Sequence, residues 1–114
     1  MGFGSRQEAG KTVVEIDEPR LDASLATPFR DYIFDLIGQG QKELVVDLSK
    51  VEFMDSSGLG AMVAALKQMG GSGAIELANP QKAVHDLFDL TCMDKIFTIH
   101  SKVNDALVSL PKSH

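Results

Sequence analysis

Residues 53–60, which read Phe-Met-Asp-Ser-Ser-Gly-Leu-Gly, separate a strand pattern from a helix pattern. The preceding residues 44–48 are almost continuously apolar, as in a parallel strand that is covered on both faces. Beyond the polar turn, apolar side chains recur every three or four positions, which predicts a core-facing helix over about residues 57–69. That stripe consists of Leu59, Met62, Val63, Leu66 and Met69. A buried strand, a short polar turn and an amphipathic helix together indicate an α/β domain.

The two serines of this stretch are predicted to lie at the N-terminus of the helix. The first N–H groups of a helix lack intrahelical partners, and the helix dipole concentrates partial positive charge there. A phosphate on Ser56 or Ser57 would therefore meet favourable electrostatics. Asp and Ser are also favoured N-cap residues, each worth about 1 kcal/mol, so capping alone explains their presence. The two interpretations are compatible, because one serine can cap the helix while the other is displayed to a partner.

The rest of the chain alternates between strand and helix patterns. Strands are predicted over residues 12–16, 43–48, 74–77 and 96–99, with a short strand or extended turn at residues 20–22. Helices are predicted from Thr27-Pro28 to Gly38, over residues 57–69, after Asn79-Pro80, and over residues 103–110. This order predicts a single small α/β domain, with a four- to five-stranded, mostly parallel or mixed sheet flanked by about four helices.

The N-terminal residues 1–11 contain three glycines and few apolar side chains. We expect them to form a flexible tail. The folded domain is therefore expected to span residues 12–110. Because the chain has 114 residues and no evident apolar interface stripe, it is expected to be a monomer.

Charge and cysteine content exclude several classes of function. A formal net charge of −5 argues against binding nucleic acid or inserting into an anionic membrane. The single cysteine, Cys92, allows no intrachain disulfide, and the N-terminus has no apolar secretory segment. The cytoplasm is therefore the expected location. Three histidines and one cysteine without ligand spacing predict no metal site, and no cofactor motif is present.

The serines are not in a pattern typical of a catalytic nucleophile. A nucleophile elbow needs glycine two positions before the serine, where Ser56 has Met54 and Ser57 has Asp55. Neither His85, inside a predicted helix, nor His100, after a predicted strand, is placed as an evident base. We therefore expect no catalytic residue and no enzyme activity.

Two aspartates share a distinctive position in the predicted fold. Asp22 and Asp55 each fall where a strand pattern ends and a helix pattern approaches. Because the carboxyl ends of strands in an open α/β sheet tend to share one edge, we expect Asp22, Asp55, Ser56 and Ser57 to form one acidic and hydroxyl-bearing patch.

At this point the chain resembles a known family. The run Asp-Ser-Ser-Gly-Leu-Gly at residues 55–60, after the strand 45–48, looks like the signature of bacterial STAS domains and in particular of the stand-alone anti-sigma factor antagonists. Leu21-Asp22 resembles the short element that precedes the family's first helix. Residues 83–90 and 95–97 resemble its later helix and strand. The resemblance covers roughly residues 12–108.

The resemblance implies a small sheet flanked by helices and a switch controlled by phosphorylation. Members of the family bind a serine protein kinase that doubles as an anti-sigma factor, and by sequestering it they release the sigma factor. The kinase phosphorylates the first serine of the motif, which is Ser56 in this chain, and a metal-dependent serine phosphatase reverses the reaction. The implied partner-binding residues are Asp22, Asp55, Ser56, Ser57, Gly58 and Leu59.

The chain departs from the family just before Asp22, where Pro19-Arg20 replaces a common Gly-Glu pair, so the detailed partner contacts there are expected to differ. An alternative function is that of a non-switching STAS subunit in a stress-signalling or lipid-transport complex, which would use the same surface constitutively. The intact Asp-Ser-Ser-Gly motif favours the switch.

Overall fold

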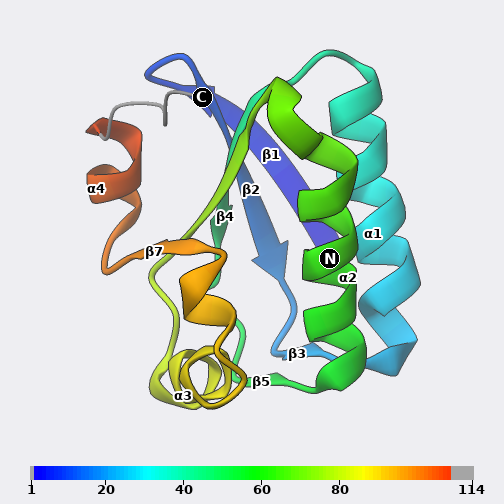
Figure 1. Cartoon of the computed structure of the whole chain (residues 1–114), viewed down its shortest axis with the longest axis vertical. Helices are drawn as coiled ribbons and strands as arrows, with labels where there is room; N and C mark the ends of the chain where they lie inside the picture. Colours follow the sequence, from blue (N-terminus) through cyan, green and yellow to red (C-terminus); the bar gives the residue numbers. More distant parts are fainter. Residues whose placement is uncertain (1, 109–114) are drawn as a thin grey trace.

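Strands and helices alternate along residues 2–108, which are the residues that the computed structural model describes (Figure 1). The strands are β1 (Gly2–Glu8), β2 (Lys11–Asp17), β3 (Arg20–Leu21), β4 (Glu43–Asp47), β5 (Phe53–Met54), β6 (Ala74–Ala78) and β7 (Thr98–His100). The helices are α1 (Ala23–Gly38), α2 (Ser56–Met69), α3 (Lys82–Leu90) and α4 (Val103–Val108), with two 3-10 turns, η1 (Gly70–Ser72) and η2 (Met93–Lys95).

Five strands form one mixed sheet in the order β1-β2-β4-β6-β7. β1 pairs antiparallel with β2, and the other neighbours are parallel. The short strands β3 and β5 pair with each other in a separate parallel ribbon. The predicted α/β domain with a mixed sheet of up to five strands and four helices is confirmed.

The main core lies on the face of the sheet that α1 and α2 cover (Figure 1). Alternate strand residues such as Val14 and Val46 point into this core and meet Phe29 and Ile33 of α1, and all four side chains are fully buried. On the opposite face, Val13, Val45 and Ala78 contact Ala106 of α4 in a second, smaller cluster. The sheet therefore has a well-covered face and a face that is only partly covered, by one short helix.

Two polar contacts involve buried charged side chains of the sheet, and one of them attaches α4 to the second face. Lys11 is 7% exposed, and its Nζ donates to the backbone oxygen of Ala106 over 2.7 Å. Nearby, Glu76 is 6% exposed, and its Oε1 lies 2.8 Å from Nε2 of His100. The first contact joins the start of β2 to α4, which are far apart in the sequence, and the second joins the neighbouring strands β6 and β7.

The N-terminal residues differ from the predicted tail, because residues 2–8 form the edge strand β1. The turn into β2 places Ala9 and Gly10 at φ +54° and +80°, the left-handed pair that suits a tight hairpin. Phe3 then packs on α1, with ring centroids 5.5 Å from Phe29 and 5.7 Å from Tyr32. This aromatic contact gives the glycine-rich strand an apolar anchor that local composition does not reveal.

The first helix begins earlier than predicted. The Thr27-Pro28 pair predicts a helix start, but α1 begins at Ala23 and contains Pro28. Asp22 caps it, with Oδ1 accepting from the backbone N–H of Ser24 over 3.0 Å. A carboxylate cap one turn upstream therefore replaces the expected threonine cap.

The starts of a later helix and a later strand also differ from the prediction. Helix α3 begins at Lys82 with Gln81 as its N-cap, and β7 begins at Thr98 rather than at residue 96, which is the C-cap of η2. The predicted helix 103–110 is present as α4 as far as Val108. Residues 109–110, and with them the predicted end of the domain, lie outside the described residues.

Candidate functional site

Two strand–aspartate–helix units lie side by side at one end of the sheet. In the parallel ribbon, Arg20 is opposite Phe53 and Leu21 is opposite Met54. The next residues in register are Asp22 and Asp55, which begin α1 and α2 as their N-caps. The N–H of Asp55 also donates to the Leu21 oxygen over 3.4 Å. The ribbon thus brings the two predicted aspartates to the same edge.

Asp55, rather than a serine, caps α2. Its Oδ1 accepts from the backbone N–H groups of Ser57 over 2.9 Å and Gly58 over 3.0 Å. Ser56 is exposed, and Ser57 is half-buried. Because the carboxylate satisfies the first turn, the Ser56 hydroxyl is not needed to cap the helix. Ser56 is therefore the more accessible of the two serines.

Gly58 brings the first turn of α2 into contact with the β3–β5 ribbon. A Cβ at this position would overlap the backbone oxygen of Leu21 and lie 3.0 Å from Cγ of Met54. Gly60, two residues later, has nothing within 4 Å of such a Cβ. Close packing therefore requires glycine at 58, and Gly60 leaves the surface beside Ser56 open. Leu59 is 9% exposed and belongs to the main core.

Asp22 is the second carboxylate at this edge. Its Oδ1 accepts from Oγ of Ser24 over 2.6 Å as well as from the Ser24 N–H. These hydrogen bonds, the one from the hydroxyl first, lower the pKa of Asp22, and the nearby Arg20 guanidinium lowers it further. Asp22 is therefore an anion at neutral pH and is engaged in its own helix cap.

A shallow hollow of about 420 Å³ runs along α2 from Ser56. Leu59, Val63 and Ala64 supply apolar walls, Lys67 lies at the far end, and Met93 of η2 closes one side. Sequence reasoning included Ser56 and Leu59 but missed Lys67 and Met93. The apolar periodicity of α2 places Lys67 on the exposed side of the helix, so the sequence could have indicated it. Nothing local to residue 93 indicates that η2 packs beside this helix.

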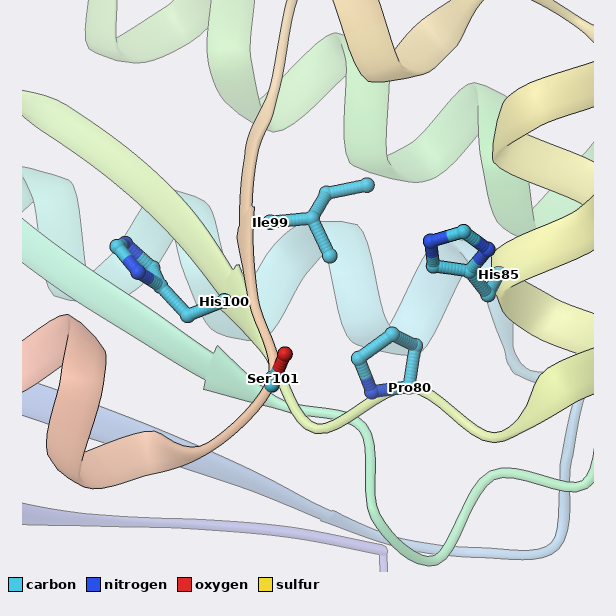
Figure 2. Close-up of a pocket in the computed structure, with 5 residues that line it drawn as sticks. All are labelled: Pro80, His85, Ile99, His100 and Ser101. Carbon is cyan, nitrogen blue, oxygen red and sulfur yellow. The ribbon is translucent and has the colours of Figure 1, made fainter.

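A second hollow, of about 180 Å³, contains two histidines (Figure 2). Figure 2 shows the His85 ring near Ile99 on one side of the β7 segment, whereas the His100 side chain points to the other side. There His100 contacts Glu76. Ser101 also lines the hollow, but no hydrogen bond joins it to His85 among the described residues. The histidines therefore do not converge on a serine.

Residues 2–108 contain neither a candidate metal centre nor a candidate membrane-spanning helix. No group of three or more His, Cys, Asp or Glu side chains is arranged to hold a metal ion in this range. Of the helices in the same range, none is both long enough and apolar enough to cross a membrane.

The chain belongs to the STAS domain family, because the model of that family matches residues 5–106. A Thermotoga maritima protein described as a candidate anti-sigma factor antagonist is 30% identical over 97 residues, covering 83% of this chain and 86% of the relative. The anti-sigma-F factor antagonist RsfB of Mycobacterium tuberculosis is 28% identical over 90 residues, covering 79% and 74%.

Solved structures agree with this assignment. An anti-sigma factor antagonist from Mycobacterium paratuberculosis superposes with a TM-score of 0.84 at 27% identity, covering 92% of this chain and 89% of that one. The antagonist SpoIIAA in its unphosphorylated form gives a TM-score of 0.78 at 20% identity, with 93% of each chain covered. The second comparison concerns the fold alone.

Proposed function

We propose that this protein is an anti-sigma factor antagonist that binds a serine protein kinase of the anti-sigma factor class and is switched off by phosphorylation of Ser56. In the unphosphorylated state it sequesters the kinase and so frees a sigma factor. A metal-dependent serine phosphatase restores the active state. The protein acts by binding and has no catalytic residue of its own.

The observation that carries this proposal is that Asp55 caps α2 while the neighbouring Ser56 remains exposed. Asp55 accepts the N–H groups of the first turn, so the exposed Ser56 hydroxyl can be modified without removing a helix cap. A phosphate there would also lie at the positive end of a fourteen-residue helix. Both features favour Ser56 over the half-buried Ser57 as the acceptor.

Relatives named anti-sigma factor antagonists support the role, although those names describe the relatives themselves. SpoIIAA, which shares the fold, has been solved in a phosphorylated form with a TM-score of 0.70 at 20% identity. The partner surface would include Asp22, Asp55, Ser57, Gly58 and Leu59 around Ser56. Gly58 and Leu59 would act mainly by shaping the edge, because both are buried.

The switch would operate through charge. Phosphate adds about −1.5 to −2 charge at neutral pH. A partner surface shaped for an uncharged hydroxyl would have to accommodate that charge next to two carboxylates. A loss of ~3 kcal/mol would weaken binding more than a hundredfold, since each ~1.4 kcal/mol is a factor of ten.

The test uses the purified chain and each serine kinase of the anti-sigma factor class encoded in the genome of origin. We expect one kinase to bind the chain, to transfer phosphate from ATP to Ser56, and to lose affinity for the product. Fragment mass mapping identifies the acceptor. Phosphate on Ser57, or phosphate retained in Ser56→Ala, would contradict the assignment.

Calorimetric titration of two variants then separates switching from folding. Ser56→Ala should bind the kinase and resist being switched off. Ser56→Asp should bind more weakly while keeping its melting temperature, since a carboxylate suits the helix N-terminus. Kinase binding without any phosphorylation would favour the constitutive STAS subunit instead.

A further inference from the structure

Arg20 and Phe53 form a stacked pair on the outer side of the β3–β5 ribbon. The two residues are opposite each other in register, and the guanidinium carbon lies 4.4 Å from the centre of the phenyl ring. Side chains alternate along a strand, so Leu21 and Met54 point inward and are buried while the pair points outward. Phe53 is 40% exposed, and the Arg20 side chain is 60% exposed. The pair is therefore a preformed feature of the surface.

The Arg20 guanidinium can still bind a carboxylate from another protein. Its Nε lies 3.4 Å from Oδ2 of Asp22, which engages one edge of the group. Among residues 2–108, Asp22 supplies the only carboxylate within ion-pair distance of Arg20. Stacking on Phe53 holds the guanidinium plane, which reduces the entropy lost when a planar, two-point contact forms.

The pair is continuous with the candidate partner surface. Arg20 and Phe53 each lie two positions before an N-cap aspartate, Asp22 or Asp55, and Ser56 lies three positions after Phe53. Arginine and aromatic side chains often dominate the energetics of protein interfaces. Arg20 also places a positive charge at this edge, in a chain whose formal net charge is −5.

We infer that Arg20, stacked on Phe53, determines partner specificity by binding an Asp or Glu side chain of the kinase. The inference rests on the proposed function and adds the chemistry of the contact. A guanidinium and a carboxylate match as a two-point, charge-assisted pair. An acidic side chain on the partner would also repel a phosphate on the same edge, so this contact would strengthen the response of the complex to phosphorylation at Ser56.

Titration of the kinase with matched charge-removing variants tests the inference. Arg20→Gln should weaken binding by about tenfold, and its affinity should depend less on salt than that of the wild type. Arg20→Lys keeps the charge but loses the planar fork, so it should lie between the two. Phe53→Leu should weaken binding by removing the stacking platform.

Arg6→Gln is the control, because Arg6 is an exposed arginine of β1 that pairs with Glu8 and Glu15. The affinity of this variant for the kinase should stay within about twofold of the wild type.

A charge exchange gives a second, independent measurement. Arg20→Glu should abolish most binding, and replacing the facing acidic residue of the kinase by Arg should restore it. Thermal melts identify any variant that has lost its fold. If the wild type binds and Ser56→Asp is impaired but Arg20→Gln and Arg20→Glu bind normally, the inference is overturned while the proposed function stands. If no kinase binds the wild type, both fail.

Discussion

At the scale of the residue, two glycines of α2 look alike in the sequence but have different roles in the structure. Gly58 and Gly60 are both in the first turns of the helix, yet only Gly58 faces a backbone carbonyl, that of Leu21. Glycine at 58 is a packing requirement that positions Asp55 and Ser56 against β3. Glycine at 60 leaves an open surface next to the exposed serine.

Alanine at the two positions should therefore have opposite effects. Gly58→Ala should lower the free energy of unfolding by about 1–3 kcal/mol, because its Cβ overlaps the Leu21 oxygen and the helix must shift. Gly60→Ala should raise it by about 0.5–1 kcal/mol, because alanine is the better helix former and its Cβ meets nothing. Urea unfolding of both variants is the measurement. Equal effects would mean that α2 does not pack this closely on β3.

The Asp22 carboxylate should give a measurable pH dependence. Hydrogen bonds from Ser24 and the charge of Arg20 lower its pKa in the folded state. A lowered folded pKa contributes stability above the ordinary aspartate value, and that stability is lost as the pH falls through the lowered pKa. Carboxyl NMR titration should place the Asp22 midpoint below that of a typical aspartate. Ser24→Ala should move the midpoint upward; an unchanged midpoint would exclude the hydroxyl as the main cause.

At the scale of the element, β1 depends on a contact made far away in the sequence. Its residues are polar or glycine apart from Phe3, and its outer edge has no neighbouring strand among the described residues. β1 has few apolar residues to hold it in place, but two features compensate. These are the Ala9-Gly10 turn and the packing of Phe3 against Phe29 and Tyr32.

Removing the Phe3 ring therefore tests whether β1 is part of the folded domain. Phe3→Ala should lower the free energy of unfolding by about 2 kcal/mol, roughly half the cost for a fully buried phenylalanine. Ser5→Ala, at an exposed position of the same strand, should change it by less than about 0.5 kcal/mol. Guanidinium unfolding of both variants provides the comparison. Equal stability of Phe3→Ala and the wild type would restore the interpretation of residues 1–11 as a flexible tail.

At the scale of the whole molecule, the dimensions are those of a single small domain. The principal extents are 29 × 24 × 23 Å, and the Cα radius of gyration is 12.7 Å. A chain of this length is expected to have a radius near ~13 Å when folded alone. Net negative charge also disfavours self-association.

We therefore expect a monomer in dilute solution. Small-angle scattering at micromolar concentration should give a radius of gyration close to that of the single chain, with no dependence on protein concentration. Sedimentation should give one species of about 12.3 kDa. A stable dimer under these conditions would contradict the expectation and would indicate that the candidate surface, or the edge of β1, pairs with a second copy.

The sequence alone was sufficient for features that depend on neighbouring residues. The apolar run before residue 48, the stripe of α2 and the Asp-Ser-Ser turn between them predict the α/β class and the position of the candidate switch. The physical reason is locality, because caps and apolar periodicity act within one or two helical turns. The same locality makes Asp22 predictable, because it lies between a strand pattern and a helix pattern.

The tertiary structure alone decided which distant segments meet. Register between β3 and β5 stacks Arg20 on Phe53, η2 brings Met93 to the hollow along α2, and α1 provides the aromatic support that makes residues 2–8 a strand. It also decided that Asp22 rather than Thr27 is the N-cap of α1. Such pairings depend on loop closure and on burial summed over the whole domain. No window of neighbouring residues contains that information, so the contribution of distant segments to the candidate site is visible only in the folded chain.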